Sequence, residues 1–530
     1  MPSVTESGRS ISRRELLQYG AGGFAAVALG LPGLSSASTR RLSAGPKRGG
    51  TLKFARSITP TQLDPSNSII AGDVYTLDKI FEPLYITSPS GKLTPWLATG
   101  YTVSPNKKAF TFKLRPGVKF SNGKPLTAAD VVFSIDRART NKKGPLSFLD
   151  FAITKLEAKD PATVVVQLSA PWAPLLSDIS AFSNGIMPAN YGGKTEAEFL
   201  KSPVGTGPFM LSGAFTAGGS SLTLVRNPNY WQSGKPYLDA VDFLFVDNDN
   251  QRVLQLRGGQ VQVIDSVPPA QVAALRSDAN LAVGLYPAWE VDLLVFNEKN
   301  AKFADRNVRR AITYAIDRPA LVHAATFGTA KPGGSFFPPS LQYYSKRTPL
   351  LNHSVAKAKA ELAKSKFAAG FSTELLIDGG VQKWRTFAQI IQQELKPIGI
   401  NVKIQALDHA AYHEAFQKFD YQMFIDYAIN DISDADEMAS FEVDVVNGGS
   451  TSYWSNYNSP TAIKLVRAAQ AEFNPRRRAA LYAQVQKIVS QDAPFVPLDY
   501  PTYILARSKK VHGFAVNPGG AYRLEDVWLD

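Results

Sequence analysis

The chain has 530 residues, of which 44% are apolar, and 58 Lys and Arg stand against 45 Asp and Glu. This composition is typical of a folded protein, and the length excludes a single small domain. The absence of cysteine excludes disulfides, thiolate catalysis, Cys-ligated zinc, iron–sulfur clusters and a cysteine-linked lipid anchor. The net charge of +13 comes from scattered basic residues, so we expect a solvated surface and no nucleic-acid partner.

Residues 1–37 have the layout of a secretory signal peptide. A polar segment precedes the apolar stretch 19–34 and the small residues 35–37. The segment Ser12–Leu17 (SRRELL) resembles the twin-arginine export motif, and the alternative is a Sec signal that contains Arg-Arg by chance. Residues 38–48 are predicted to form a linker, and no later apolar run is long enough to span a bilayer. We therefore expect an exported, soluble, periplasmic protein without a lipid anchor.

The mature chain opens with a predicted strand at 51–55, and the clearest local unit follows at 109–136. Phe110, Phe112 and Leu114 alternate with polar residues, which predicts a strand with one buried face. Thr127 and Asp130 have the spacing of a capping box, which predicts that a helix begins there.

Helices and strands continue to alternate in the second half of the chain. The apolar spacing from 308 to 316 predicts a helix capped by Asp305, and a second helix restarts near Pro319. Apolar residues from 384 to 395 predict another helix, and the alternation at 400–404 predicts a strand after it. This interleaving favours the α/β class.

Several separated segments together resemble the bacterial extracellular solute-binding family 5, the dipeptide-, oligopeptide- and nickel-binding proteins of ABC importers. They are 81–84 (FEPL), 93–98 (LTPWLA), 112–120 (FKLRPGVKF), 123–131 (GKPLTAADV), 205–209 (GTGPF), 227–231 (NPNYW), 308–318 (VRRAITYAIDR), 399–400 (GI) and 492–494 (DAP). They cover nearly the whole mature chain in the family's order.

The resemblance implies a periplasmic-binding-protein-like fold of the cluster C type, with two α/β lobes, a hinge, and an extra domain inserted in the first lobe. Lobe I would comprise 49–72, 203–286 and 496–530, the inserted subdomain 73–202, and lobe II 287–495. The hinge would lie near 286–291 and 494–500. The resemblance further implies a monomer that closes around a ligand and delivers it to the membrane permease subunits of an ABC importer.

The resemblance also points to candidate ligand-binding residues. Arg385 stands where peptide-binding members hold an arginine for the ligand carboxylate, and its planar fork suits that task. The alternative is a surface arginine at the start of a helix. In the loop 427–437, Tyr427 takes the place of a tryptophan, and Asn430 or Asp431 that of the aspartate that meets the ligand's amine. Asp431 and Asp434 belong to an acidic run that either faces the ligand or forms a solvated loop.

Four further aromatic residues are candidates for an apolar wall around the ligand, or else belong to the core. They are Trp289, Trp384, Trp454 and Tyr500. His409 and His413 have the i, i+4 spacing of a metal pair, but neither zinc-protease pattern is met, and two histidines at the edge of a helix are the simpler interpretation.

Catalytic motifs are missing from the sequence: it contains no GxSxG, P-loop or GxGxxG motif, and its S-x-x-K matches lack the partner motifs. We therefore expect a binding protein without cofactor or metal, most simply for a di- or oligopeptide. The alternatives are the same fold with another cargo, such as a nickel chelate, an opine or a sugar, and a secreted hydrolase.

Overall fold

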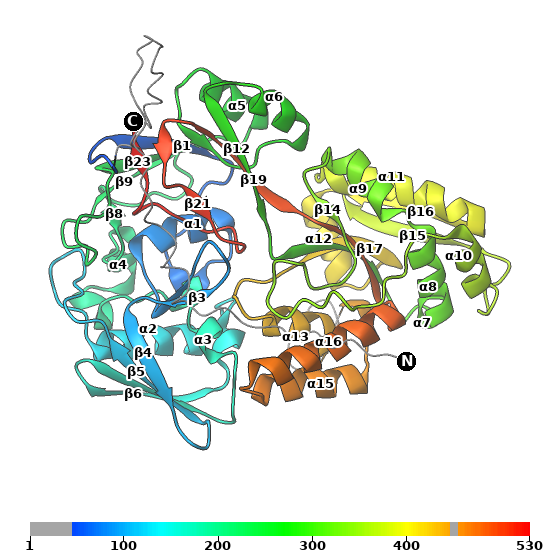
Figure 1. The fold of residues 1–530 in the computed structure, drawn as a ribbon, viewed down its shortest axis with the longest axis horizontal. Helices are drawn as coiled ribbons and strands as arrows, with labels where there is room; N and C mark the ends of the chain where they lie inside the picture. Colours follow the sequence, from blue (N-terminus) through cyan, green and yellow to red (C-terminus); the bar gives the residue numbers. More distant parts are fainter. Residues whose placement is uncertain (1–44, 446–453) are drawn as a thin grey trace, which may run out of the picture. The chain divides into compact units, whose positions relative to one another are not determined.

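The computed structural model describes residues 45–445 and 454–530, and Pro46–Asp530 form one compact unit (Figure 1). The predicted signal peptide, with its twin-arginine-like segment, and most of the predicted linker lie outside the described residues. Within the described ranges, no helix is both long and apolar enough to cross a membrane.

A first large sheet has the strand order β12-β19-β11-β1-β10-β9-β8. Its strands are β1 (Thr51–Arg56), β8 (Phe209–Leu211), β9 (Ser221–Arg226), β10 (Ala240–Phe245), β11 (Val263–Ile264), β12 (Leu281–Pro287) and β19 (Thr502–Ser508). The predicted strand at 51–55 is confirmed as β1, which runs parallel to β10 and β11. Alternation along β1 places Leu52 and Phe54 in one apolar core and Ala55 in another, so both faces of the sheet are covered.

Helices pack on the two faces of this sheet. α1 (Ala71–Ile80) shares a core with Leu52 and Phe54, whereas α5 (Asp249–Arg257) and α6 (Val272–Arg276) share a core with Ala55. Two small hairpins of the C-terminal segment complete this part of the fold. They are β20 (Val511–His512) with β23 (Trp528–Leu529), and β21 (Ala515–Val516) with β22 (Tyr522–Arg523).

A four-stranded sheet of order β4-β5-β7-β6 lies between β1 and β8 in sequence. Its strands are β4 (Ala98–Val103), β5 (Ala109–Leu114), β6 (Ile153–Asp160) and β7 (Thr163–Leu168), and β2 (Tyr85–Thr87) pairs with β3 (Leu93–Pro95) nearby. The predicted strand is confirmed as β5, with Phe110 and Phe112 buried. The capping box of Thr127 and Asp130 begins α2 (Ala128–Thr140), as predicted. Two short helices, α3 (Leu175–Asp178) and α4 (Glu196–Lys201), follow.

A second large sheet has the order β14-β18-β13-β17-β15-β16. Its strands are β13 (Glu290–Phe296), β14 (Lys331–Pro332), β15 (Phe371–Asp378), β16 (Ile400–Leu407), β17 (Met423–Ile429) and β18 (Phe495–Tyr500). Its helices are α7 (Ala301–Ala304), α8 (Arg306–Ala315), α9 (Arg318–Thr326), α10 (Val355–Leu362), α11 (Gln382–Leu395), α12 (His409–Gln417), α13 (Asp436–Val443), α15 (Pro460–Ala471) and α16 (Pro475–Asp492). The helices expected after Asp305 and near Pro319 are α8 and α9, and the predicted helix and strand at 384–404 are α11 and β16.

Two crossings connect the large sheets. β12 leads directly into β13 through Ala288 and Trp289, and β18 leads into β19 through Pro501. β12 and β19 pair along their whole length, from Leu281 with Ser508 to Pro287 with Thr502. Figure 1 shows this pair, with β19 in red beside β12 in green. Residues at the crossings therefore reach both large sheets.

Candidate functional site

Three adjoining cavities in the described part of the chain lie beside these crossings. The α1 cavity, of about 160 Å³, is lined by Tyr75, Phe81, Trp289, Asp431 and Arg523 among others. The Lys383 cavity, of about 500 Å³, is lined by Arg56, Tyr75, Lys383, Asp499 and Tyr503 among others. The α13 cavity, of about 260 Å³, is lined by Tyr427, Asp431, Glu437 and Phe441 among others. The α1 cavity shares Tyr75 with the Lys383 cavity and Asp431 with the α13 cavity, so the three form one continuous run.

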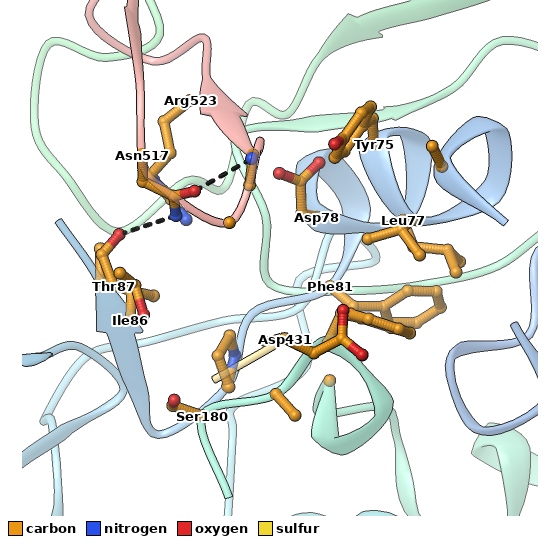
Figure 2. Close-up of a pocket in the computed structure, with 18 of the residues that line it drawn as sticks. Tyr75, Leu77, Asp78, Phe81, Ile86, Thr87, Ser180, Asp431, Asn517 and Arg523 are labelled. Carbon is orange, nitrogen blue, oxygen red and sulfur yellow. Dashed lines mark hydrogen bonds between the residues drawn. The ribbon is translucent and has the colours of Figure 1, made fainter. Parts of the chain in front are cut away.

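The α1 cavity is mainly apolar, with a few polar groups at its edge. Figure 2 shows Tyr75 and Asp78 projecting from α1 on one side and Asp431 on another. Arg523 also lines this cavity, but its guanidinium is already engaged, because it donates to Glu82 Oε1 at 3.1 Å and to Glu525 Oε1 at 2.5 Å. An apolar cavity with few polar groups is typical of a small-molecule site.

Asp431 is the acid that faces both the α1 and the α13 cavities. Burial raises its pKa to about 6, and a hydrogen bond to Glu437 partly opposes that effect. Burial and the Asp431 charge in turn raise the pKa of Glu437. The partly buried Asp431 and the buried Glu437 therefore form an acidic pair, and a cation entering the cavity would stabilise its ionised form.

Lys383 lies at the start of α11 and reaches the Lys383 cavity with a side chain that is 26% exposed. It forms an ion pair with Asp292 of β13 and lies 3.7 Å from Asp499 Oδ2 of β18. Burial disfavours its charge, but Asp292, Asp499 and Glu290 outweigh that effect and raise the pKa of Lys383. This cluster joins α11, β13 and β18 at the crossings.

Three residues singled out from the sequence lie at these cavities. Trp289 is buried at the first crossing, where its indole nitrogen donates to Ser340 O at 3.0 Å and its ring lines the α1 cavity. Tyr427 is 49% exposed and lines the α13 cavity. Asp431 lies between the two cavities. The structure thus places Trp289 beside the same run of cavities as Tyr427 and Asp431, which lie more than 100 positions later in the sequence.

Trp384 and Arg385 do not line these cavities. Trp384 packs in the core of the second sheet, and Arg385 donates to Gly379 O in the turn before α11 and to Gln382 Oε1 at the start of α11. The helix places its neighbour Lys383 toward the cavity instead, because residues two positions apart lie about 200° apart around a helix. The sequence analysis chose Arg385 because of the family resemblance. It missed Lys383 because the spacing of residues along α11 does not by itself show which side of the helix faces the cavity.

Asn430 and Asp434 hold the acidic loop together. The Asn430 side chain donates to Asp434 O at 2.9 Å and accepts from Met438 N at 2.9 Å. Asp434 is buried in a two-pronged ion pair with Arg478, in which Arg478 Nη2 donates to Asp434 Oδ1 at 2.9 Å and Nη1 donates to Oδ2. The loop is therefore a folded start to α13 and not a solvated run.

Tyr500 and Trp454 also lie in the packing of the second sheet. The Tyr500 hydroxyl donates to Ser335 O at 2.8 Å and accepts from Ser335 N at 2.7 Å. The Trp454 ring lies 4.2 Å, centroid to centroid, from the ring of Phe416. Neither lines one of the three cavities.

The predicted histidine pair lies at the start of α12. The rings of His409 and His413 are 4.5 Å apart, and His409 Nδ1 lies 2.7 Å from Asp378 Oδ2. Burial and the His409 charge lower the pKa of His413. Over residues 45–445 and 454–530, the structure contains no group of three or more His, Asp or Glu side chains arranged to hold a metal ion.

Comparison with known proteins decides the family. The sequence model of the bacterial extracellular solute-binding proteins, family 5 (middle region), matches residues 92–448, more than half of the chain. The chain belongs to this family. The resemblance stated from the sequence is confirmed, and family 5 is a family of solute-binding proteins, not of enzymes.

Individual relatives of this family 5 protein agree with the assignment. The probable D,D-dipeptide-binding periplasmic protein DdpA of Escherichia coli (strain K12) is 31% identical over 88% of this chain and 92% of its own length. The periplasmic binding protein DppA of Helicobacter pylori, solved with the peptide STSA, is 27% identical, with a TM-score of 0.76 over 91% of this chain and 98% of its own.

A third relative was solved with a different cargo. The binding protein AgaA of A. tumefaciens R10, in complex with agropinic acid, is 30% identical, with a TM-score of 0.76 over 91% of this chain and 99% of its own. Together with DppA it confirms the predicted α/β fold of the periplasmic-binding type for this family 5 protein.

Proposed function

We propose that this protein captures a short peptide in the run of cavities at the crossings and delivers it to the permease subunits of an ABC importer, without catalysing a reaction. Family membership supports solute binding, and the relatives DdpA, a probable D,D-dipeptide-binding protein, and DppA, solved with the peptide STSA, support a peptide. The observation that carries the proposal is Asp431, a partly buried carboxyl in a cavity lined by residues of α1, of the C-terminal segment and of β17 in the second sheet. Such a group suits the ammonium of a peptide's free amino end.

The lobe boundaries are part of the same proposal. We take lobe I as 49–72, 203–286 and 496–530, the inserted subdomain as 73–202 and lobe II as 287–495. The run of cavities then lies where ligand would contact both lobes, with Trp289 and Tyr427 as walls and Asp431 as the ammonium partner. A bound ligand that contacts both lobes stabilises the closed arrangement over the open one.

Calorimetric titration of two variants with the ligand released from the purified protein tests this proposal. Asp431→Asn should weaken binding at least about thirtyfold, because it leaves a buried ligand ammonium without its partner charge. Arg385→Ala is the control, and it should change affinity less than about threefold because the Arg385 guanidinium is held by Gly379 and Gln382 and lines none of the three cavities. The opposite pattern would assign Arg385 to the ligand carboxylate and remove Asp431 from the site.

A second cargo class has one observation in its favour, namely that AgaA was solved with agropinic acid. Mass spectrometry of the material released by mild denaturation distinguishes the classes. An intact peptide supports the proposal, an opine or a sugar replaces it with the second cargo class, and progressive cleavage of the added ligand would point to a hydrolase.

We further propose export through the twin-arginine pathway, with the mature protein free in the periplasm. The support is the SRRELL segment and the apolar stretch after it. Replacing Arg13 and Arg14 by Lys keeps the charge and should leave the precursor in the cytoplasm, as measured by fractionation and immunoblotting. Normal export of the double variant would assign the signal to the Sec pathway.

A further inference from the structure

Four carboxylates and one cation meet at the crossings on the second sheet. Glu290 and Asp292 lie on β13, Asp426 on β17 and Asp499 on β18, and Lys383 reaches them from α11. Asp292 and Asp499 are direct cross-strand neighbours. Like charges in that position destabilise a sheet, so packing alone does not account for the pair.

Asp499 provides an independent indication of a ligand. Its side chain is 0% exposed, it lines the Lys383 cavity, and no N–H or hydroxyl of the described residues donates to its oxygens. Burial, the Asp292 charge and a hydrogen bond shared with the Asp292 carboxyl raise the pKa of Asp499. The nearest cation, Lys383 Nζ, is 3.7 Å away and is already in closer contact with Asp292. A buried carboxylate without a donor is costly unless a positively charged or donating group approaches it.

The other cations near the cavities are occupied. Arg56 lines the Lys383 cavity, but its guanidinium donates to Thr76 Oγ1 and to the carbonyls of Ala71 and Gly72. Arg523 lines the α1 cavity and is held by Glu82 and Glu525. Within the described ranges, Lys383 is therefore the one cation set against the four carboxylates of the cluster.

Like Asp499, two other acids of this cluster have raised pKa values. Burial raises the pKa of Glu290 to about 7, with Lys383 opposing and Asp292 adding to the rise. Burial likewise raises the pKa of Asp426 to about 7. Burial and, in addition, the Glu290 charge raise the pKa values of Tyr75, Tyr503 and Tyr427, which line the cavities, so Glu290 adds negative charge near them without itself lining any of the three.

We propose that the Lys383 cavity is a second cation subsite, which takes the ammonium or guanidinium group of a basic ligand side chain against Asp499, the acid of the cluster that lines this cavity. The inference rests on the proposed peptide function and names its substrate class: a short peptide with a Lys or Arg side chain in addition to its free amino end. Asp431 holds the amino end, and Tyr75, which both cavities share, lies between the two cation positions. The volume of about 500 Å³ accommodates a long side chain, and Tyr75 and Tyr503 offer aromatic faces to its stem and charge.

The first test compares matched tripeptides by calorimetry on ligand-free protein. Ala-Lys-Ala should bind at least about tenfold more tightly than Ala-Gln-Ala, and Ala-Glu-Ala should bind most weakly, because the uncompensated charge of the subsite is negative. Equal affinity for the Lys and Gln peptides would overturn the cation subsite while leaving the peptide function intact.

The second test locates the subsite. Asp499→Asn, which keeps the shape of the side chain, should remove most of the preference for Lys over Gln and change the affinity for Ala-Gln-Ala less than about threefold. Asp130→Asn, at the capping box of α2, is the control and should keep the preference. A preference that survives Asp499→Asn would overturn the assignment. The wild-type comparison stands by itself if Asp499→Asn does not fold.

The diamine 1,5-diaminopentane separates the inference from the proposed function. Binding of the diamine in the absence of any peptide binding would support the cation subsite and overturn the peptide function. Failure of the diamine and of all three peptides to bind would overturn both.

Discussion

Several of the separated segments that resemble family 5 meet in space at the side chain of Glu82. The residue lies in the segment FEPL and is fully buried. Its carboxylate accepts hydrogen bonds from side chains of four other segments: Trp96 Nε1 (2.7 Å), Thr206 Oγ1 (3.0 Å), Tyr230 OH (3.1 Å), Trp231 Nε1 (3.0 Å) and Arg523 Nη2 (3.1 Å). The segments LTPWLA, GTGPF and NPNYW thus converge on one buried carboxylate and tie the inserted region to the first sheet.

Glu82→Gln should lower the free energy of unfolding by about 3 kcal/mol, since it removes one charge of a buried pair with Arg523 and turns one acceptor into a donor that faces donors. Urea unfolding measures the change. Glu157→Gln is the control, because Glu157 forms only a surface ion pair with Lys155 and should contribute less than about 1 kcal/mol. A loss of stability at Glu82 no larger than at Glu157 would contradict this role.

The sequence indicates some residues of the candidate site and not others. Trp289 and Asp431 were found because the resemblance fixes their place in the chain, and both line the cavities. Asp499 was missed because the buried strand FVPLDY does not show which side chains face a cavity. Its encounter with Lys383 joins residues more than 100 positions apart, and only the register of β13 with β18 creates it. Their roles toward a ligand stay predictions.

At the scale of elements, the sequence predicted the helices and strands whose formation depends on residues close together in the chain. The alternation in β5 and the capping box of α2 involve neighbours in sequence, so the sequence indicates both. The order of strands within the sheets and the pairing of β12 with β19 depend on contacts between distant segments. The predicted lobe boundaries rest on the resemblance and stay predictions.

The contact between α3 and α13 is unusual because acids face one another across it. Burial raises the pKa of Asp178 on α3, and the charges of Asp436, Asp150 and Asp434 add to the rise. Burial raises the pKa of Asp150 to about 7, opposed by hydrogen bonds from Asn184 and by Arg139, and burial raises the pKa of Asp436 to about 7. Ser177 and Ser433 lie 2.7 Å apart at the same contact, so the segments meet closely.

These raised values predict that stability falls as pH rises. The unfolded Asp150 titrates near 3.8 and the folded one near 7, so between these values the folded protein holds a proton that the unfolded chain has lost. The stabilisation is present at low pH and is lost as the pH approaches 7. Urea unfolding at pH 5 and pH 8 should show the advantage of wild type over Asp150→Asn shrinking by about 1 kcal/mol or more.

Glu157→Gln provides the control for this experiment, because Glu157 is exposed and its ion pair with Lys155 lies on the surface, apart from the groups that act on Asp150. Its stability relative to wild type should stay the same at both pH values. A pH-independent difference between wild type and Asp150→Asn would show that Asp150 is ionised in the folded protein.

At the scale of the whole molecule, each large sheet has apolar clusters of its own. One cluster contains residues between Trp289 and Tyr500, and others gather residues of the first sheet or of the inserted region. A small cluster of Leu146, Leu149, Ala181 and Ile432 joins the inserted region to the loop before α13. Because the large cores are separate, a movement of one sheet relative to the other leaves both intact and changes mainly the crossings and the cavities.

Ligand binding should therefore make the molecule both more compact and more stable. In the proposed site the ligand would contact both large sheets. Because a ligand that binds only the folded protein stabilises it, saturation at 100 times Kd should raise the free energy of unfolding by about 2.7 kcal/mol. Small-angle scattering with and without the ligand should show a smaller radius of gyration for the complex. Asp431→Asn at the same ligand concentration is the control and should gain little in either measurement. If the ligand stabilises the wild type but leaves its radius of gyration unchanged, the cavities are already closed before the ligand binds. An importer would then have to recognise the ligand-bound form by some feature other than closure.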